Sequence, residues 1–132
     1  MSFSNFTENA LLAHLMATYT VYVGYGTSAA GEDGSGAAEP AGGTGYAREA
    51  YGAYTLTAVG VDAQVVTNDA DVVFDVASSS QGTISHVYFY DDLTAGNFLG
   101  EVSFAELSLS DIPMIGGSNI KIAAGLCKVT CD

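Results

Sequence analysis

From residue 20 onward, the chain is a series of short β-branched and aromatic runs separated by Gly, Asp, Asn and Ser. In the clearest run, residues 83–90, Ile84 and Tyr88 fall on one face and Val87 on the other, as the period of two in a strand requires. About seven or eight such runs predict an all-β fold of the β-sandwich or jelly-roll-like type. Strands are expected within 20–25, 46–61, 65–66, 72–76, 83–90, 98–104, 119–123 and 126–130, and Pro113 is expected to interrupt the chain between strands.

The first 18 residues have a helical pattern instead. Asn5 and Glu8 have the spacing of a capping box, in which the Asn5 side chain accepts from the N–H of Glu8. A short helix is marginal by itself, so it must dock on its own sandwich or on a neighbouring protein. Its apolar stripe consists of Leu11, Leu12, Leu15 and Met16.

The length of 132 residues fits one domain. We therefore expect a helical segment at 1–18 and a single β-sandwich domain at 19–132. Within that domain, residues 28–44 are rich in Gly and Ala, contain three acids and carry almost no large apolar residue. This composition predicts a long mobile loop, and removing 29–43 should leave the domain folded but weaken attachment to a partner.

The charge balance excludes some classes of partner. Fifteen acids face three strong cations, Arg48, Lys121 and Lys128, for a net charge of −12. Nucleic-acid binding needs clustered cations, and anionic membranes repel such a chain, so neither partner is expected. The absence of a long apolar run or a signal peptide predicts synthesis in a cytoplasm. The negative charge serves solubility, or it fits a basic partner or a salt-rich environment.

The two cysteines, Cys127 and Cys131, lie four residues apart in an expected strand. At that spacing their Cα atoms are about 13 Å apart, too far for a mutual disulfide. Two buried thiols are the first interpretation, and an intermolecular bond in an assembled particle is the second.

No catalytic motif is evident. Of the two histidines, His14 is expected to pack or to lie on the surface and His86 to be a hydrogen-bonded strand residue, and neither a zinc set nor a phosphate-binding loop occurs. Acid clusters at 68–71 and 91–92 are candidates for calcium, although plain acidic turns explain them better. The sequence therefore predicts no enzyme activity, no catalytic residue, no cofactor and no metal site.

Six motifs in order along the chain resemble a family of small phage virion proteins of the tail-fibre-like or decoration type. They are Asn9–Leu15, Thr20–Gly24, Gly45–Arg48, Gly82–His86, Gly96–Leu99 and Ala123–Leu126. Each motif is weak alone, whereas the ordered set spans most of the chain.

The resemblance implies a β-sandwich in a bacteriophage virion, synthesised in the bacterial host cytoplasm. Its first implication is a capsid decoration (cement) protein that binds the major capsid protein and stabilises the head. The alternative is a tail-fibre or baseplate module that binds the host surface or other tail proteins. A calcium-dependent carbohydrate-binding accessory of an enzyme is a third hypothesis. Partners would be other virion proteins and the chain itself, as a dimer or trimer.

The N-terminal helix and the 28–44 region are the segments expected to contact partners. The expected interface residues are Phe6, Leu11, Leu12, Leu15, Glu32, Asp33, Glu39, Tyr46 and Arg48.

Overall fold

The structure is a computed structural model that describes residues 4–59 and 62–130. The chain forms two compact units, and each combines segments that are far apart in sequence. The first unit consists of Met1–Thr20, Tyr51–Val72 and Ile122–Asp132, and the second consists of Val21–Ala50 and Val73–Lys121.

In the first unit, helix α1 (Asn5–Thr18) begins one residue earlier than the capping-box pattern predicts. Ser4, not Asn5, is the N-cap: its backbone is extended, and its Oγ accepts from the N–H of Thr7 at 3.4 Å. The Ser4 carbonyl also accepts from the N–H of Glu8, so the helical hydrogen bonds already start before Asn5. The Asn5 cap is therefore wrong, while the short N-terminal helix is confirmed.

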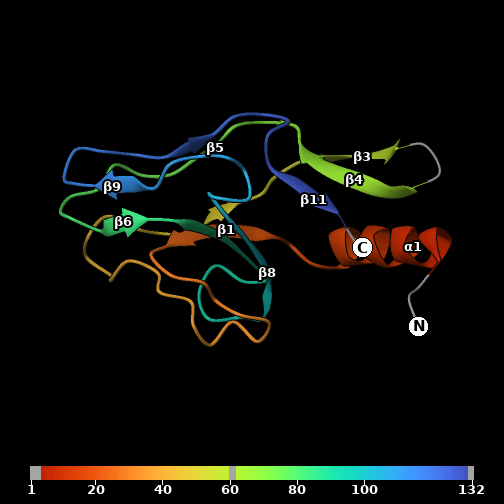
Figure 1. Cartoon of the computed structure of the whole chain (residues 1–132), viewed down its shortest axis with the longest axis horizontal. Coiled ribbons are helices and arrows are strands. Elements are labelled where there is room, and N and C mark those ends of the chain that lie inside the picture. Colours follow the sequence, from red (N-terminus) through yellow and green to blue (C-terminus); the bar gives the residue numbers. More distant parts are fainter. Residues whose placement is uncertain (1–3, 60–61, 131–132) are drawn as a thin grey trace. The chain divides into compact units, whose positions relative to one another are not determined.

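A three-stranded antiparallel sheet completes the first unit. Its order is β11 (Lys128–Thr130), β4 (Asp62–Asn68), β3 (Tyr54–Val59), with β3 and β4 adjacent in the chain (Figure 1). Helix α1 packs against β4. Leu12 and Met16 of the helix are buried, and Val66 at the centre of β4 is completely buried, so the apolar stripe of the helix covers the middle strand.

The second unit is built on a four-stranded sheet in the order β2 (Glu49–Ala50), β1 (Tyr22–Gly26), β7 (His86–Tyr90), β8 (Phe98–Ser103). All neighbours are antiparallel, and β1 pairs with β7 along its whole length. Val87, Tyr88, Phe89 and Tyr90 are all buried in succession, so both faces of β7 are covered. This continuous burial explains why the 83–90 run is apolar on both sides.

The expected strand at 83–90 is divided at Ser85. Its first part, β6 (Gly82–Ile84), leaves the sheet and pairs with β9 (Ile112–Met114). Pro113 lies within β9, opposite Thr83, instead of interrupting the chain. A two-stranded ribbon tolerates proline because a strand at an edge has N–H groups that no neighbour needs.

A further short pair joins β5 (Val72–Val73) and β10 (Lys121–Ile122), where the chain passes from one unit to the other. With eleven strands and one helix among the described residues, the all-β fold class is confirmed. Its assignment to the sandwich or jelly-roll type stays a prediction. Within residues 4–59 and 62–130, no helix is long and apolar enough to cross a membrane.

Candidate functional site

The 28–44 region is irregular, as expected, but it is fastened to the second unit's sheet. The Tyr88 hydroxyl on β7 donates to the Ser28 carbonyl and accepts from the N–H of Ala38 at 3.2 Å. Within the loop, the N–H of Gly36 donates to the carbonyl of Ala30 at 2.9 Å, and Ala30 is buried. Small side chains let the loop backbone approach the sheet closely. The loop is therefore held to the sheet by hydrogen bonds, and its mobility stays a prediction.

A carboxylate from β8 holds the start of the same loop. Glu101 accepts from the N–H of Ala30 at 2.7 Å and from the N–H of Gly31 at 3.2 Å. Gly34 lies on Phe98, where a Cβ would be only 2.6 Å from the ring. The loop is thus fitted to β8 by charge-assisted hydrogen bonds and by a glycine that a larger residue cannot replace without displacement.

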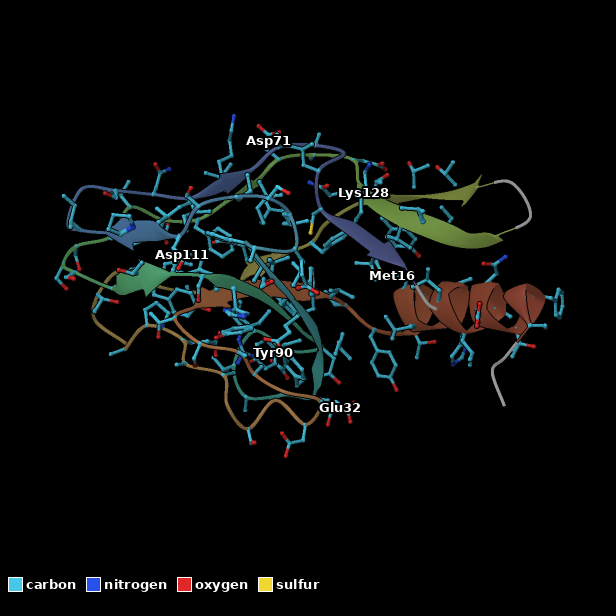
Figure 2. All side chains as sticks on the ribbon, viewed as in Figure 1. Met16, Glu32, Asp71, Tyr90, Asp111 and Lys128 are labelled. Carbon is cyan, nitrogen blue, oxygen red and sulfur yellow. The ribbon has the colours of Figure 1, made fainter. Side chains whose placement is uncertain are left out.

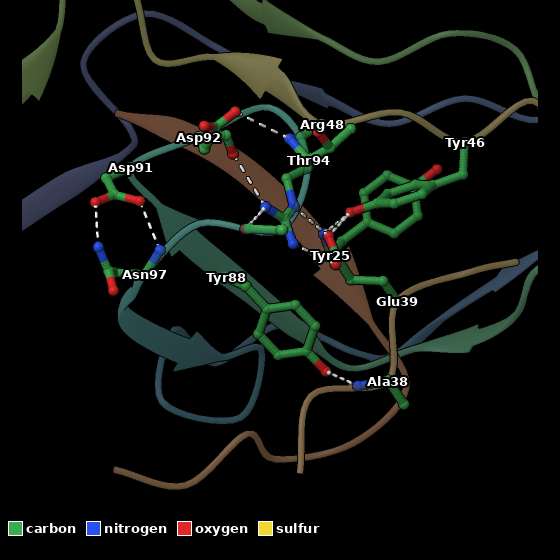
Figure 3. Close-up of polar contacts among 11 residues, drawn as sticks. Tyr25, Ala38, Glu39, Tyr46, Arg48, Tyr88, Asp91, Asp92, Thr94 and Asn97 are labelled. Atoms are coloured by element: carbon green, nitrogen blue, oxygen red, sulfur yellow. Dashed lines mark hydrogen bonds and ion pairs between the residues drawn. The ribbon is translucent and has the colours of Figure 1, made fainter. Parts of the chain in front are cut away.

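The central feature of the second unit is the buried guanidinium of Arg48 (Figure 3). Its Nε and Nη2 donate to the two carboxylate oxygens of Glu39 at 2.8 and 2.7 Å, in a bidentate pair. Nη1 donates to the carbonyls of Asp92 and Ala95 at 3.0 and 2.7 Å. The Cζ atom lies 3.4 Å from the centroid of the Tyr90 ring, within range of a cation–π interaction.

Tyr46 completes this group, which we call the Arg48 cluster (Glu39, Tyr46, Arg48 and Tyr90). The Tyr46 hydroxyl donates to Glu39 and accepts from the N–H of Tyr25 at 3.3 Å. Burial opposes ionisation of Glu39, but the hydrogen bonds from Arg48 and Tyr46 and the Arg48 charge outweigh it and lower its pKa. Burial and the Glu39 carboxylate raise the pKa of Tyr46.

Strand β1 leaves room for the Arg48 cluster through Gly24. A Cβ at this position would lie 2.5 Å from the Tyr46 hydroxyl and 2.7 Å from Glu39 Oε1. The glycine of the Thr20–Gly24 motif therefore serves to admit the Tyr46 and Glu39 side chains above the sheet.

The acidic turn at 91–97 presents the two carbonyls that Arg48 contacts (Figure 3). Asp91 accepts from the backbone N–H and the side-chain amide of Asn97, at 2.6 and 2.7 Å, and these bonds lower its pKa. Asp92 accepts from the N–H of Thr94 at 3.3 Å. The carboxylates at this candidate calcium position thus order a turn.

The second candidate calcium position, 68–71, also orders turns. Asp69 accepts from the Thr55 hydroxyl at 2.6 Å, and Asp71 accepts from the N–H of Ala124 at 2.9 Å. Among the residues that the structure describes, no group of three His, Cys, Asp or Glu side chains is placed to hold a metal ion.

A buried polar centre in the first unit was not expected from the sequence. Asn68 is 1% exposed, and its amide donates to the carbonyls of Ala70 and Ala123 at 2.8 and 3.1 Å. Its Oδ1 accepts from the N–H of Cys127 at 2.9 Å, while the Tyr51 hydroxyl donates to the Cys127 carbonyl. Burial raises the pKa of the Cys127 thiol to about 12, so this thiol is unreactive. Cys131 lies outside the described residues.

The four helix residues expected at an interface are in different environments. Leu12 is buried within the first unit and Leu15 is half-buried, so Leu12 packs internally. Phe6 and Leu11 are exposed by 82% and 47%. Phe6 thus leaves most of its side chain exposed, and Leu11 about half.

Five further interface residues are expected in the 28–44 loop and just after it, and they too lie in different environments. Glu32 and Asp33 are exposed at the tip of the loop, and Figure 2 shows Glu32 projecting outward. Glu39, Tyr46 and Arg48 are brought together in the Arg48 cluster, where their polar atoms bind one another. Their local sequence gives no signal for this, because the contacts depend on loop geometry. A role of any of these residues in binding a partner stays a prediction.

Comparison with known proteins gives one family. The family model described as "Podophage GP4 fiber I protein gp80" matches residues 2–128. A search of the curated proteins finds no match. The resemblance to small phage virion proteins is thereby confirmed. Because the match covers nearly the whole chain, the protein belongs to the podophage GP4 fiber I protein gp80 family and is a structural protein of a phage virion.

Proposed function

We propose that this protein is a structural module of a phage fibre, with other virion proteins as its partners. The observation that carries the proposal is the family match across residues 2–128, whose description names a fibre protein. It favours the tail-fibre alternative over capsid decoration, which is the first implication of the sequence resemblance. Capsid decoration, with the major capsid protein as partner, becomes the second candidate.

The geometry of the second unit supports a structural role. Its most buried charged group, Arg48, is fully engaged by Glu39, two carbonyls and an aromatic ring. Such a network fixes the position of a loop and leaves no activated nucleophile or base in it. We therefore propose that the protein contributes contacts and rigidity to the particle and carries no catalytic activity.

The copy number in purified virions tests the location. Quantitative mass spectrometry should give a molar ratio to the major capsid protein far below one, because a fibre occupies few sites on a particle. Immunogold labelling should place the protein on the tail. A ratio near one, with label over the head, would replace the fibre proposal by capsid decoration.

A separate assay tests the non-catalytic part of the proposal. Incubation of the purified protein with isolated host-surface polysaccharide should release no reducing ends above a heat-denatured control. Release that saturates with substrate would show that the protein is an enzyme, whatever its location on the particle.

A further inference from the structure

Helix α1 has an outer face that no part of its own unit covers. The buried face contains Leu12 and Met16, which pack on β4. At about 100° per residue, one line of positions runs along the helix roughly 110° around the axis from this face, with spacings of four, three and four residues. They are Phe6, Ala10, Ala13 and Ala17, and all but the half-buried Ala13 are exposed.

This outer face is unusual for an exposed helix because it carries no Asp, Glu, Lys or Arg side chain. Surface helices ordinarily place charged residues opposite the core. Here the helix has a single acid, Glu8, which is buried at 8% exposure. The polar residues beside the apolar line, His14 and Thr18, hydrogen-bond each other at 3.3 Å. Phe6 is the most exposed large apolar side chain of the described residues.

Several of the other exposed apolar residues lie beside acids, whereas Ile115 and Leu126 do not. In the second unit Val76 follows Asp75, Leu93 follows Asp92, Leu107 follows Glu106 and Ile112 follows Asp111. Two copies of a chain with net charge −12 would bring like charges together at those places. Helix α1 contains one of the chain's 15 acids and buries it, so its outer face is a surface on which a second copy can approach without this repulsion.

We propose that the outer face of α1 is a self-association surface, on which α1 of a second copy packs with Phe6 at the contact. The alternating spacing of four and three is that of a helix–helix seam, and alanines in the seam allow the two backbones to approach closely. The proposal concerns contact between copies and holds for a fibre and for a head protein alike.

The size of this surface sets the strength of the association. The exposed parts of Phe6 and the alanines amount to on the order of 300 Å² per copy, against about 800 Å² per partner in a stable complex. Free copies should therefore associate weakly, and more strongly when salt screens their charge. In a particle, where copies are held close together, the same contact gains from high effective concentration.

Sedimentation equilibrium of the full chain, up to about 1 mM and at about 0.15 and 0.5 M NaCl, tests the proposal. The average mass should rise reversibly with concentration, and more steeply at high salt. The variant Phe6→Glu/Ala10→Glu should shift association to at least about tenfold higher concentration. The control Thr57→Glu/Ser79→Glu adds the same charge at exposed positions outside α1 and should associate like the natural chain.

Circular dichroism checks that each variant is folded, and Phe6→Ser, which removes the apolar contact without adding charge, serves if the double variant does not fold. A natural chain that stays monomeric under every condition overturns the proposal and leaves the face to a different partner. Association of the folded double variant, or of Phe6→Ser, at the same concentration as the natural chain overturns it as well.

Discussion

A single cation organises much of the second unit. Arg48 connects the loop through Glu39, the 91–97 turn through two carbonyls, and strand β7 through the Tyr90 ring. Its side chain is only 8% exposed, so both members of the ion pair have lost much of their hydration. Such a pair is costly to break because the remaining partner stays desolvated.

Replacing Arg48 with Met should lower the free energy of unfolding by about 3 kcal/mol, since Glu39 then remains partly buried without its cation. Urea denaturation followed by circular dichroism measures this change. Adding Glu39→Leu should restore part of the loss, because two apolar residues leave no unpaired charge. Lys128→Met, at an exposed position, should change stability by less than about 0.5 kcal/mol. Equal effects at Arg48 and Lys128 would contradict the importance of the Arg48 cluster.

The first unit depends on an uncharged residue in a comparable way. Asn68→Leu keeps the number and branching of the side-chain heavy atoms but leaves the N–H of Cys127 and the carbonyl of Ala70 without the partner that Asn68 supplies. The carbonyl of Ala123 loses one of its two donors and keeps the N–H of Leu126. We expect a loss of about 3 kcal/mol in the same denaturation experiment, because buried polar groups without hydrogen bonds are penalised. The matched control Asn119→Leu, at an exposed site, should be nearly neutral. A neutral Asn68→Leu would show that water replaces the lost bonds.

At the level of elements, local patterns predict the helix and the main strands well. Alternation of apolar residues identifies the regions that become β1, β7 and β8, and the N-terminal periodicity identifies α1. The ends of helices and strands are harder to predict, because they depend on which other segments pack or pair with them. Ser4 caps α1 instead of Asn5, and Pro113 lies inside β9 because that strand is in a two-stranded ribbon. Neither outcome follows from the local sequence.

The Arg48 cluster could be predicted only in part. The sequence predicts that three residues of this cluster bind a partner: Glu39, Tyr46 and Arg48. It does not predict that they bind one another. Their actual arrangement requires Gly24 to leave space and the 91–97 turn to supply carbonyls. Arg48 and the carbonyls of Asp92 and Ala95 are 44 and 47 residues apart in the chain, so no periodicity or spacing rule encodes these contacts. The sequence likewise gives no sign that Asn68 is buried.

The structure changes the expected result of removing residues 29–43. This deletion eliminates Glu39 and the hydrogen bonds of Ala38 with Tyr88, and it leaves Arg48 without its anion. We now expect the thermal midpoint to fall by at least about 10 °C, in calorimetry of the full chain. The tip variant Glu32→Ala/Asp33→Ala, which alters only exposed acids of the loop, should change the midpoint little. A deletion variant as stable as the tip variant would mean that the loop is a spacer.

For the molecule as a whole, the dominant property is uncompensated negative charge. Of the three strong cations, Arg48 is neutralised inside its own unit, so the net charge of −12 is set mainly by exposed acids. Repulsion between acids is already evident locally, since burial and the nearby Asp75 charge together raise the pKa of Glu49. Self-repulsion of this kind opposes the compact state and is weakened by salt.

Stability should therefore increase with ionic strength. Between about 0.02 and 0.5 M NaCl, we expect the thermal midpoint of the natural chain to rise by roughly 4 °C, because screening relieves repulsion among exposed acids while the buried Arg48–Glu39 pair is little affected. The variant Glu32→Gln/Asp75→Asn/Asp111→Asn replaces three exposed acids and changes the net charge from −12 to −9 (−12 + 3). It should be more stable at low salt and gain less from added salt. A midpoint that falls with NaCl in the natural chain would mean that exposed ion pairs, and not repulsion, dominate its surface electrostatics.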